Sequence, residues 1–399
     1  MFKSLLIYGV SEGLAKMAPF VSSMFLAALL SAEAFGFLGI ILIISELLFV
    51  VISINLQVIL RITYFQSDMH AISRRCSSHL VASTVIFVAA IPTVWLILRI
   101  NVILCILFVS YAWLRTVSSF YLTILQCRKK SFSYSVANIL YVSCLAFLSV
   151  LIVWVYDDYL CWIVAAFMAS LFQFLWLNFQ VFRQEKLLSI TFCSVKEFIK
   201  SVTLGVLFMP QALGWWLKVA GDRFAISKWY SGDVLGEYTL AFQYANVALT
   251  ITAVLNLVAI PDINELLQRK NNSDLKWVIG KNILIATIGM LMLLLAGGIV
   301  LDVYFAGKYP NSKFYFIVLC VSMFPQVLLL LVINIEYYVN GATFVAKLVL
   351  VAFLAQFLIN YYVVAPNFGV EEVVLAGGII NVVCLYLVLR KIRHILWSN

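Results

Sequence analysis

One short motif occurs twice in this chain, as Ser31-Ala32-Glu33-Ala34-Phe35-Gly36 and as Ser231-Gly232-Asp233-Val234-Leu235-Gly236. Serine, an acidic residue and glycine recur at an offset of 200 residues, and each copy follows a long apolar stretch. A serine or acidic residue suits the start of a helix, and glycine lets another backbone approach closely. In a chain of 399 residues, this offset predicts a duplication into two halves of similar fold.

The composition around the motif is that of a membrane protein. Hydrophobic residues make up 64% of the chain and charged residues 11%, whereas soluble domains carry about 25% charged residues. A soluble fold of this size could not bury so much apolar surface, so a soluble enzyme and a disordered chain are both excluded. A helix needs about 20 mainly apolar residues to cross the hydrocarbon core. Twelve stretches qualify: Ser4–Leu30, Phe37–Leu60, Leu80–Leu98, Val102–Leu125, Tyr134–Val155, Tyr159–Val181, Val202–Ala220, Leu235–Ile260, Trp277–Val300, Phe314–Val339, Thr343–Val364 and Val373–Leu389.

The basic residues predict how these spans are oriented. With the N-terminus in the cytoplasm, eighteen of the 27 Lys and Arg residues fall in cytoplasmic segments, five in outward loops and four within spans. Cytoplasmic loops of membrane proteins carry an excess of this kind. We therefore expect both termini in the cytoplasm. The net charge of +9 then reflects orientation, and no nucleic-acid partner is expected.

Six spans in each half make the halves parallel repeats, related by an axis along the membrane normal. The sequence thus predicts an all-α integral membrane protein with 12 transmembrane helices in two six-helix lobes, residues 1–182 and 201–399. Between the lobes lies segment 183–200, where apolar residues recur at helical spacing and charged residues lie mostly off that stripe. This pattern predicts an amphipathic linker helix at the cytoplasmic interface.

Charged side chains inside spans are costly, and they usually face a cavity or one another. Glu12 and Lys16 lie one helical turn apart, so they form either a local ion pair or a cavity-lining pair with Glu12 as a proton carrier. Glu46 and Gln57 share a polar stripe on the second span. Arg115 lies near the middle of its span, where it either faces the cavity or pairs with Glu46 or Glu12.

In the second half, span 202–220 carries the most informative polar face. Pro210 interrupts its helical hydrogen bonding. The adjoining Arg223 forms either an interface pair with the preceding acid or part of a coupling site, for which Glu336 in a later span is a further candidate. The polar face would suit a ligand with rings and an anionic group. Its members recur at helical spacing: Gln211, Trp215, Lys218 and Asp222.

We expect no cofactor and no metal site. The eight cysteines form no CxxC pair, and Cys76 with His79 lacks the further ligands that a metal needs. The phosphate-binding P-loop pattern is absent. An ion gradient, the membrane potential or the substrate gradient would then supply the energy, with H+ or Na+ as candidate coupling ions, unless a partner subunit supplies ATP.

A set of short motifs occurs in order along the whole chain: Gly13-Leu14-Ala15-Lys16, Leu30–Gly36, Phe208-Met209-Pro210, Asp222–Ile226, Leu235-Gly236-Glu237-Tyr238, Gly307-Lys308-Tyr309 and Pro366–Val370. Together they resemble the polysaccharide flippases of the Wzx type, which belong to the multidrug/oligosaccharidyl-lipid/polysaccharide (MOP) exporter superfamily. The chain differs from that family in being short and in having only a modest excess of deep cations.

The resemblance implies a bacterial inner-membrane flippase and not an enzyme. It implies transfer of undecaprenyl-pyrophosphate-linked oligosaccharide, such as an O-antigen repeat unit in lipopolysaccharide biosynthesis, to the periplasmic leaflet. Membrane lipid, a polysaccharide polymerase and a chain-length regulator are the partners it suggests. A cationic cavity would hold the substrate through Lys16, Arg115, Lys218, Gln211, Trp215 and Gln57. The candidates for coupling or gating are Glu12, Glu46, Asp222, Arg223 and Glu336.

Two other functions stay open at this point. A MATE-type cation or drug antiporter would favour acids in its cavity, and deep cations outnumber deep acids here only four to three. A membrane polysaccharide polymerase would usually need an outward loop with catalytic residues, and the outward loops predicted here are short.

Overall fold

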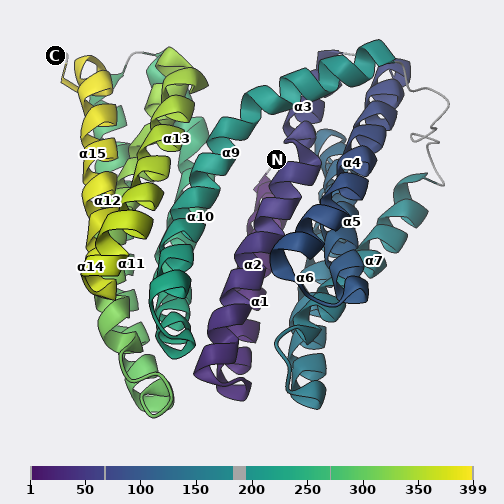
Figure 1. The fold of residues 1–399 in the computed structure, drawn as a ribbon. Coiled ribbons are helices and arrows are strands. Elements are labelled where there is room, and N and C mark those ends of the chain that lie inside the picture. The colour runs from purple at the N-terminus through teal and green to yellow at the C-terminus, as the bar shows by residue number, and fades with distance from the viewer. Residues whose placement is uncertain (1, 67–68, 183–194, 270, 398–399) are drawn as a thin grey trace. The chain divides into compact units, whose positions relative to one another are not determined.

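The computed structural model describes residues 2–66, 69–182, 195–269 and 271–397, which are almost entirely helical (Figure 1). Serine begins two of these helices, as the repeated motif predicts: Ser31 Oγ accepts a hydrogen bond from the Ala34 amide at 3.1 Å, and Ser231 Oγ accepts one from the Val234 amide at 3.5 Å. The first half comprises α1 (Phe2–Leu29), α2 (Ala32–Ser53), α3 (Leu56–Thr63), η1 (Tyr64–Gln66), α4 (Met69–Leu98), α5 (Val102–Cys127), α6 (Ser131–Tyr156), α7 (Cys161–Leu177) and η2 (Asn178–Phe182).

The second half has the same kind of architecture. Its elements are α9 (Val195–Trp229), α10 (Gly232–Gln268), α11 (Asn272–Val300), η4 (Leu301–Phe305), α12 (Ser312–Asn340), α13 (Ala342–Ile359), η5 (Asn360–Val364), α14 (Ala365–Asn367) and α15 (Val370–Trp397). Apolar side chains of several of these helices form a buried core, to which Leu329, Phe353 and Val388 belong. A corresponding core in the first half contains Leu60, Phe120 and Tyr121.

The predicted membrane-spanning character is confirmed. Among the described residues, ten helices are long and apolar enough to cross a membrane, and α9 makes an eleventh when its two bent parts are taken as one span. Within α1, residues Met17–Leu29 form a shorter apolar helix. The protein is therefore an all-helical, multi-pass membrane protein, while the full number of twelve spans stays a prediction.

The chain forms two compact units, defined here as unit 1 (Met1–Leu30 and Ile41–Leu213) and unit 2 (Ser31–Ile40 and Gly214–Asn399). The first copy of the motif thus belongs to the same unit as the second copy. Phe35, within the first copy, packs edge-on against Tyr309 with ring centroids 6.0 Å apart. The predicted lobes 1–182 and 201–399 are not tested by this division and stay a prediction.

Two predicted spans differ in detail. The expected span 37–60 is interrupted between α2 and α3, because Ile54 and Asn55 adopt φ values of 45° and 53°, which do not continue a right-handed helix. The start of α9 takes up Val195–Lys200, the end of the predicted linker helix, while 183–194 lie outside the described residues. Figure 1 shows α9 as one long helix, and its parts Phe198–Leu207 and Met209–Trp229 are bent by 46° beside Pro210.

Candidate functional site

The first polar group lies in unit 1 and joins α2 to α5. Arg115 Nη1 donates a hydrogen bond to Glu46 Oε1 at 2.7 Å and another to the Tyr111 hydroxyl at 3.4 Å. The guanidinium also lies over the ring of Phe49, 4.5 Å from its centroid. Of the pairings predicted for Arg115, the structure thus shows the one with Glu46.

This ion pair remains open on one side. The side chains of Arg115 and Glu46 are 26% and 52% exposed, so neither is fully buried between the helices. Both described hydrogen bonds of Arg115 use Nη1, and among the described residues no acceptor meets Nη2 or Nε. Arginine presents five donors in a planar fork, so Arg115 can bind an anion without leaving Glu46. Tyr141, which the sequence did not single out, adjoins Tyr111 and Arg115.

The second polar group is buried in unit 2 and connects α9 with α13 and η5. Lys218 Nζ donates to Gln356 Oε1 at 3.2 Å, and Gln356 Nε2 donates to Asp222 Oδ1 at 3.0 Å. The amide of Gln356 therefore bridges a buried ammonium and a buried carboxylate. Lys218 and Asp222 are 7% and 5% exposed, and a charge so far from water requires partners of this kind.

Asp222 receives two further hydrogen bonds. Asn360 Nδ2 donates to Oδ1 at 2.8 Å, and the Tyr238 hydroxyl donates to Oδ2 at 3.3 Å. Asn360 Nδ2 also reaches the Val373 carbonyl of α15 at 3.1 Å. Sequence reasoning placed Lys218 and Asp222 on one face of a helix but missed Gln356, Asn360 and Tyr238. Two amides one turn apart in an apolar span were the available signal.

The remaining members of the predicted α9 face lie in different surroundings. Trp215 packs against Phe353 with ring centroids 5.4 Å apart, and Lys218 Nζ lies 5.5 Å from the same ring. Gln211 is half-buried and belongs to unit 1. Arg223 is 5% exposed, and its guanidinium lies 4.3 Å from the centroid of Phe242. Its Nε has no hydrogen-bond partner within the part of the chain that the structure describes.

The other predicted site residues are not gathered at these two groups. Gln57 lies on α3, and its buried Oε1 meets no hydrogen-bond donor among the described side chains and backbone. Glu336 lies on α12 and is fully buried. Glu12 and Lys16 fall in α1, but their side chains lie outside the described residues. Within the described part of the chain, no cluster of three or more His, Cys, Asp or Glu could hold a metal ion.

A third polar contact lies just beyond the last turn of α9. The Tyr230 hydroxyl donates to the Ala365 carbonyl at 3.0 Å and also to the Phe368 carbonyl. Burial raises the pKa of Tyr230, and the nearby carboxylates of Glu371 and Glu372 raise it further. The phenol therefore keeps its proton and remains a donor, which ties the end of α9 to the segment before α15.

Comparison with known proteins identifies both the family and the fold. The family model for polysaccharide biosynthesis proteins, Polysacc_synt, matches residues 1–267. Among solved structures, the chain is similar to an inward-facing multidrug resistance MATE family transporter of the MOP superfamily, with 14% identity over 98% of this chain and 95% of that one and a TM-score of 0.69. The Vibrio cholerae MATE transporter VcmN in its bent form is 10% identical over 99% and 97% of the chains, with a TM-score of 0.63. No curated protein matches the chain.

Proposed function

This chain belongs to the Polysacc_synt family of polysaccharide biosynthesis proteins, and from that premise we propose that it is a lipid-linked oligosaccharide flippase. It would move an undecaprenyl-pyrophosphate-linked oligosaccharide, such as an O-antigen repeat unit, from the cytoplasmic to the periplasmic leaflet of a bacterial inner membrane. Alternating access would expose the binding site to each side in turn. A polysaccharide polymerase and a chain-length regulator would act on the delivered product.

The observation that carries this proposal is the open side of Arg115. A permanent cation within a span is expensive unless it has partners, and Glu46 occupies only one nitrogen of the guanidinium in this structure. A diphosphate offers several oxygens that a guanidinium binds through paired, charge-assisted hydrogen bonds. The oxygens of a lipid-linked diphosphate would therefore accept hydrogen bonds from Nη2 and Nε of Arg115, which have no acceptor among the described residues of unit 1.

The Arg115–Glu46 pair also suggests how binding and ion coupling would be linked. A bound diphosphate would place its negative charge next to the carboxylate of Glu46, which shares the guanidinium of Arg115 with it. Glu46 is therefore the first candidate for coupling transport to an ion. The buried Lys218–Gln356–Asp222 group is the second candidate for coupling, with H+ or Na+ as the ion.

Substitution of the two cations tests the proposal in a strain that lacks the chromosomal copy. We expect Arg115→Ala to reduce surface glycan strongly and to accumulate the lipid-linked repeat unit in the cytoplasmic leaflet, since the N–H donors of Nη2 and Nε are lost. Lys218→Ala should show a smaller loss. Lys313→Ala is the matched control, because Lys313 is 45% exposed and pairs with Asp302 at the start of α12. Normal surface glycan in both variants and in the double variant, at normal membrane levels, would exclude diphosphate binding by Arg115 and coupling through Lys218.

A cation or drug antiporter is the second candidate, and the similarity of fold to MATE transporters favours it. Such a transporter needs a carboxylate whose charge no protein cation already balances. Here Arg115 balances the charge of Glu46, although the Glu46 side chain is 52% exposed, and the buried Asp222 accepts hydrogen bonds from three side chains. Uptake assays in vesicles separate the two functions: efflux of a cationic dye that depends on Glu46 or Asp222, with unchanged surface glycan, would support the antiporter.

A further inference from the structure

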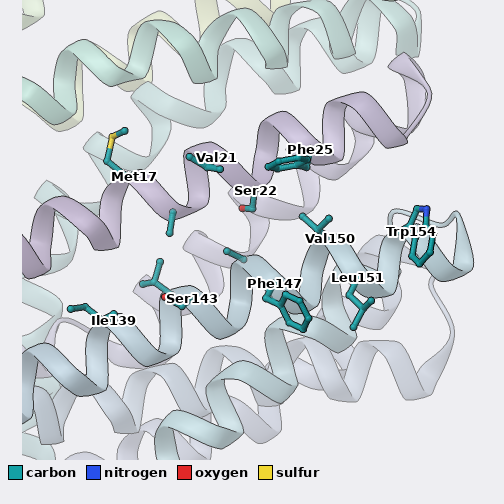
Figure 2. Close-up of a pocket in the computed structure, with 13 residues that line it drawn as sticks. Met17, Val21, Ser22, Phe25, Ile139, Ser143, Phe147, Val150, Leu151 and Trp154 are labelled. Carbon is teal, nitrogen blue, oxygen red and sulfur yellow. The ribbon is translucent and has the colours of Figure 1, made fainter.

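Unit 1 contains an apolar pocket whose lining includes neither Arg115 nor Glu46. It has a volume of about 670 Å³, and its lining residues all come from α1, between residues 17 and 25, and α6, between residues 139 and 154. Figure 2 shows Met17, Val21 and Phe25 along one helix, with Ile139, Phe147 and Leu151 along the other. A volume of this size lies in the range of ligand pockets, roughly 300–1,000 Å³.

The lining requires a ligand without polar groups. Eleven of the thirteen lining side chains are apolar or aromatic, and none is charged. The two hydroxyls belong to Ser22 and Ser143, and Ser22 Oγ already donates to the Pro19 carbonyl at 3.0 Å. Pockets for ordinary small molecules carry a few converging polar groups that fix the ligand's orientation. A cationic drug would meet no carboxylate in this lining.

Small side chains leave the space between the two helices. Ala18 and Ser22 lie one turn apart on α1, Ser143 and Ala146 lie one turn apart on α6, and all four line the pocket. Larger side chains, including Phe25 and Phe147, stand beside them. The lining follows both helices over several turns, and this elongated arrangement suits an extended hydrocarbon chain better than a ring system.

The length of the pocket distinguishes between kinds of chain. Its lining extends over sixteen residues of α6, from Ile139 to Trp154, and the distance between these two along the helix axis is about 22 Å. Half of the hydrocarbon core measures only about 15 Å, so the acyl chain of a phospholipid, confined to one leaflet, would leave part of the pocket unfilled. Trp154 ends the row with its side chain 64% exposed, a placement typical of the membrane–water interface.

We propose that this pocket binds the isoprenoid tail of the lipid-linked cargo while the diphosphate is held elsewhere in the protein. This inference rests on the proposed flippase function. A long tail held along α6 stays out of water during transfer, and it distinguishes an isoprenoid carrier from the shorter chains of the surrounding phospholipids.

Photo-crosslinking tests the tail site directly. The full-length protein in phospholipid nanodiscs is irradiated with undecaprenyl diphosphate that carries a diazirine at the tail end, and the labelled peptides are mapped by mass spectrometry. We expect labelling between residues 17 and 25 or 139 and 154, and displacement of the label by unmodified undecaprenyl diphosphate. Labelling confined to other helices would overturn the proposal. So would equal labelling by a phosphatidylethanolamine with an acyl-chain diazirine that undecaprenyl diphosphate does not displace.

Filling the pocket provides the matched comparison. Ala146→Trp should lower tail labelling at least about tenfold, a change that corresponds to about 1.4 kcal/mol of binding free energy. Ala89→Trp is the control, because Ala89 is an exposed alanine of α4 outside the pocket, and its labelling should be unchanged. Ser143→Leu fills less space and serves if the tryptophan variant does not reach the membrane.

The outcome for the tail site can be separated from the outcome for the flippase. If Ala146→Trp retains both surface glycan and tail labelling at full strength, the tail site is wrong while glycan transfer stands. If the wild-type protein moves a cationic dye, supports no surface glycan and takes up no undecaprenyl probe, the flippase function fails, and the tail site fails with it. Loss of tail labelling with retained labelling by a short-chain isoprenyl diphosphate probe supports both.

Discussion

Gly377 of α15 lies where any side chain would meet the buried polar group of unit 2. A Cβ at this position would stand 2.7 Å from Gln356 Nε2 and 3.2 Å from Lys218 Nζ. Gln356 bridges Lys218 and Asp222, so a displaced amide would weaken the partners of both charges. We expect Gly377→Ala to lower the free energy of unfolding by about 1–3 kcal/mol, as overpacking does. The measurement is the thermal unfolding midpoint of the purified protein in detergent.

A second glycine provides the reference for this substitution. A Cβ at Gly280 of α11 would meet nothing within 4 Å, and alanine is favoured over glycine in a helix by up to about 1 kcal/mol. Gly280→Ala should therefore leave the unfolding midpoint unchanged or raise it. If Gly377→Ala unfolds at the same temperature as Gly280→Ala, the bridge that Gln356 forms does not require a glycine at position 377.

The buried polar group of unit 2 was predicted only in part from the sequence. Helical spacing was enough to place Lys218 and Asp222 on one face of α9, because i and i+4 positions adjoin in any helix. Their partners Gln356 and Asn360 lie 138 residues beyond them in the chain, and no local pattern links the two segments. For Arg115 the sequence left a cavity and two pairings open, since the packing of α2 against α5 decides between them.

At the scale of elements, the repeated motif forms a close backbone contact between the starts of α2 and α10. A Cβ built on Gly236 would lie 2.0 Å from the Ala32 carbonyl oxygen, and one built on Gly36 would lie 2.7 Å from the Gly236 nitrogen. Backbone atoms cannot move aside as a flexible side chain can. We therefore expect Gly236→Ala to destabilise the protein more than Gly377→Ala does, by about 3 kcal/mol or more, in the same unfolding assay.

The control for this contact is Gly298 in α11, where a Cβ would again meet nothing within 4 Å. Gly298→Ala should unfold like the wild-type protein. A Gly236→Ala variant that matches it would show that the two helix starts do not pack this closely in the membrane. The glycines of the motif were visible in the sequence, but their contact with one another was not, because the offset of 200 residues indicates duplication and carries no information about proximity.

The sequence predicted helix boundaries correctly where the apolar stretch itself begins or ends. It did not predict a boundary that depends on the backbone conformation of single residues. Val102 starts both the predicted span and α5. The separation of α2 from α3 depends on left-handed conformations at Ile54 and Asn55, and isoleucine rarely adopts such a conformation. The bend in α9 was predicted from Pro210, because proline removes a helical hydrogen bond.

At the scale of the whole molecule, composition was sufficient for the membrane class and the all-helical fold. A chain with 64% hydrophobic residues has few other ways to satisfy its backbone in lipid than helices. Composition could not anticipate that Ser31–Ile40 would pack with the residues of unit 2. Within that unit the two motif copies make close backbone contacts, which depend on the folded arrangement.

Orientation in the membrane is the remaining property of the whole chain that the sequence predicts. Eighteen of the 27 basic residues fall in segments that would be cytoplasmic, and the insertion machinery retains such loops on the inner side. Green fluorescent protein fused after Asn399 should therefore fluoresce, and alkaline phosphatase fused at Asp157, between α6 and α7, should be active. Moving the phosphatase to Lys130, between α5 and α6, is the internal control and should abolish its activity. Active phosphatase at Lys130 and none at Asp157 would contradict the predicted orientation. The basic residues of the 128–130 turn would then lie on the outer face, opposite to the usual cytoplasmic placement of Lys and Arg.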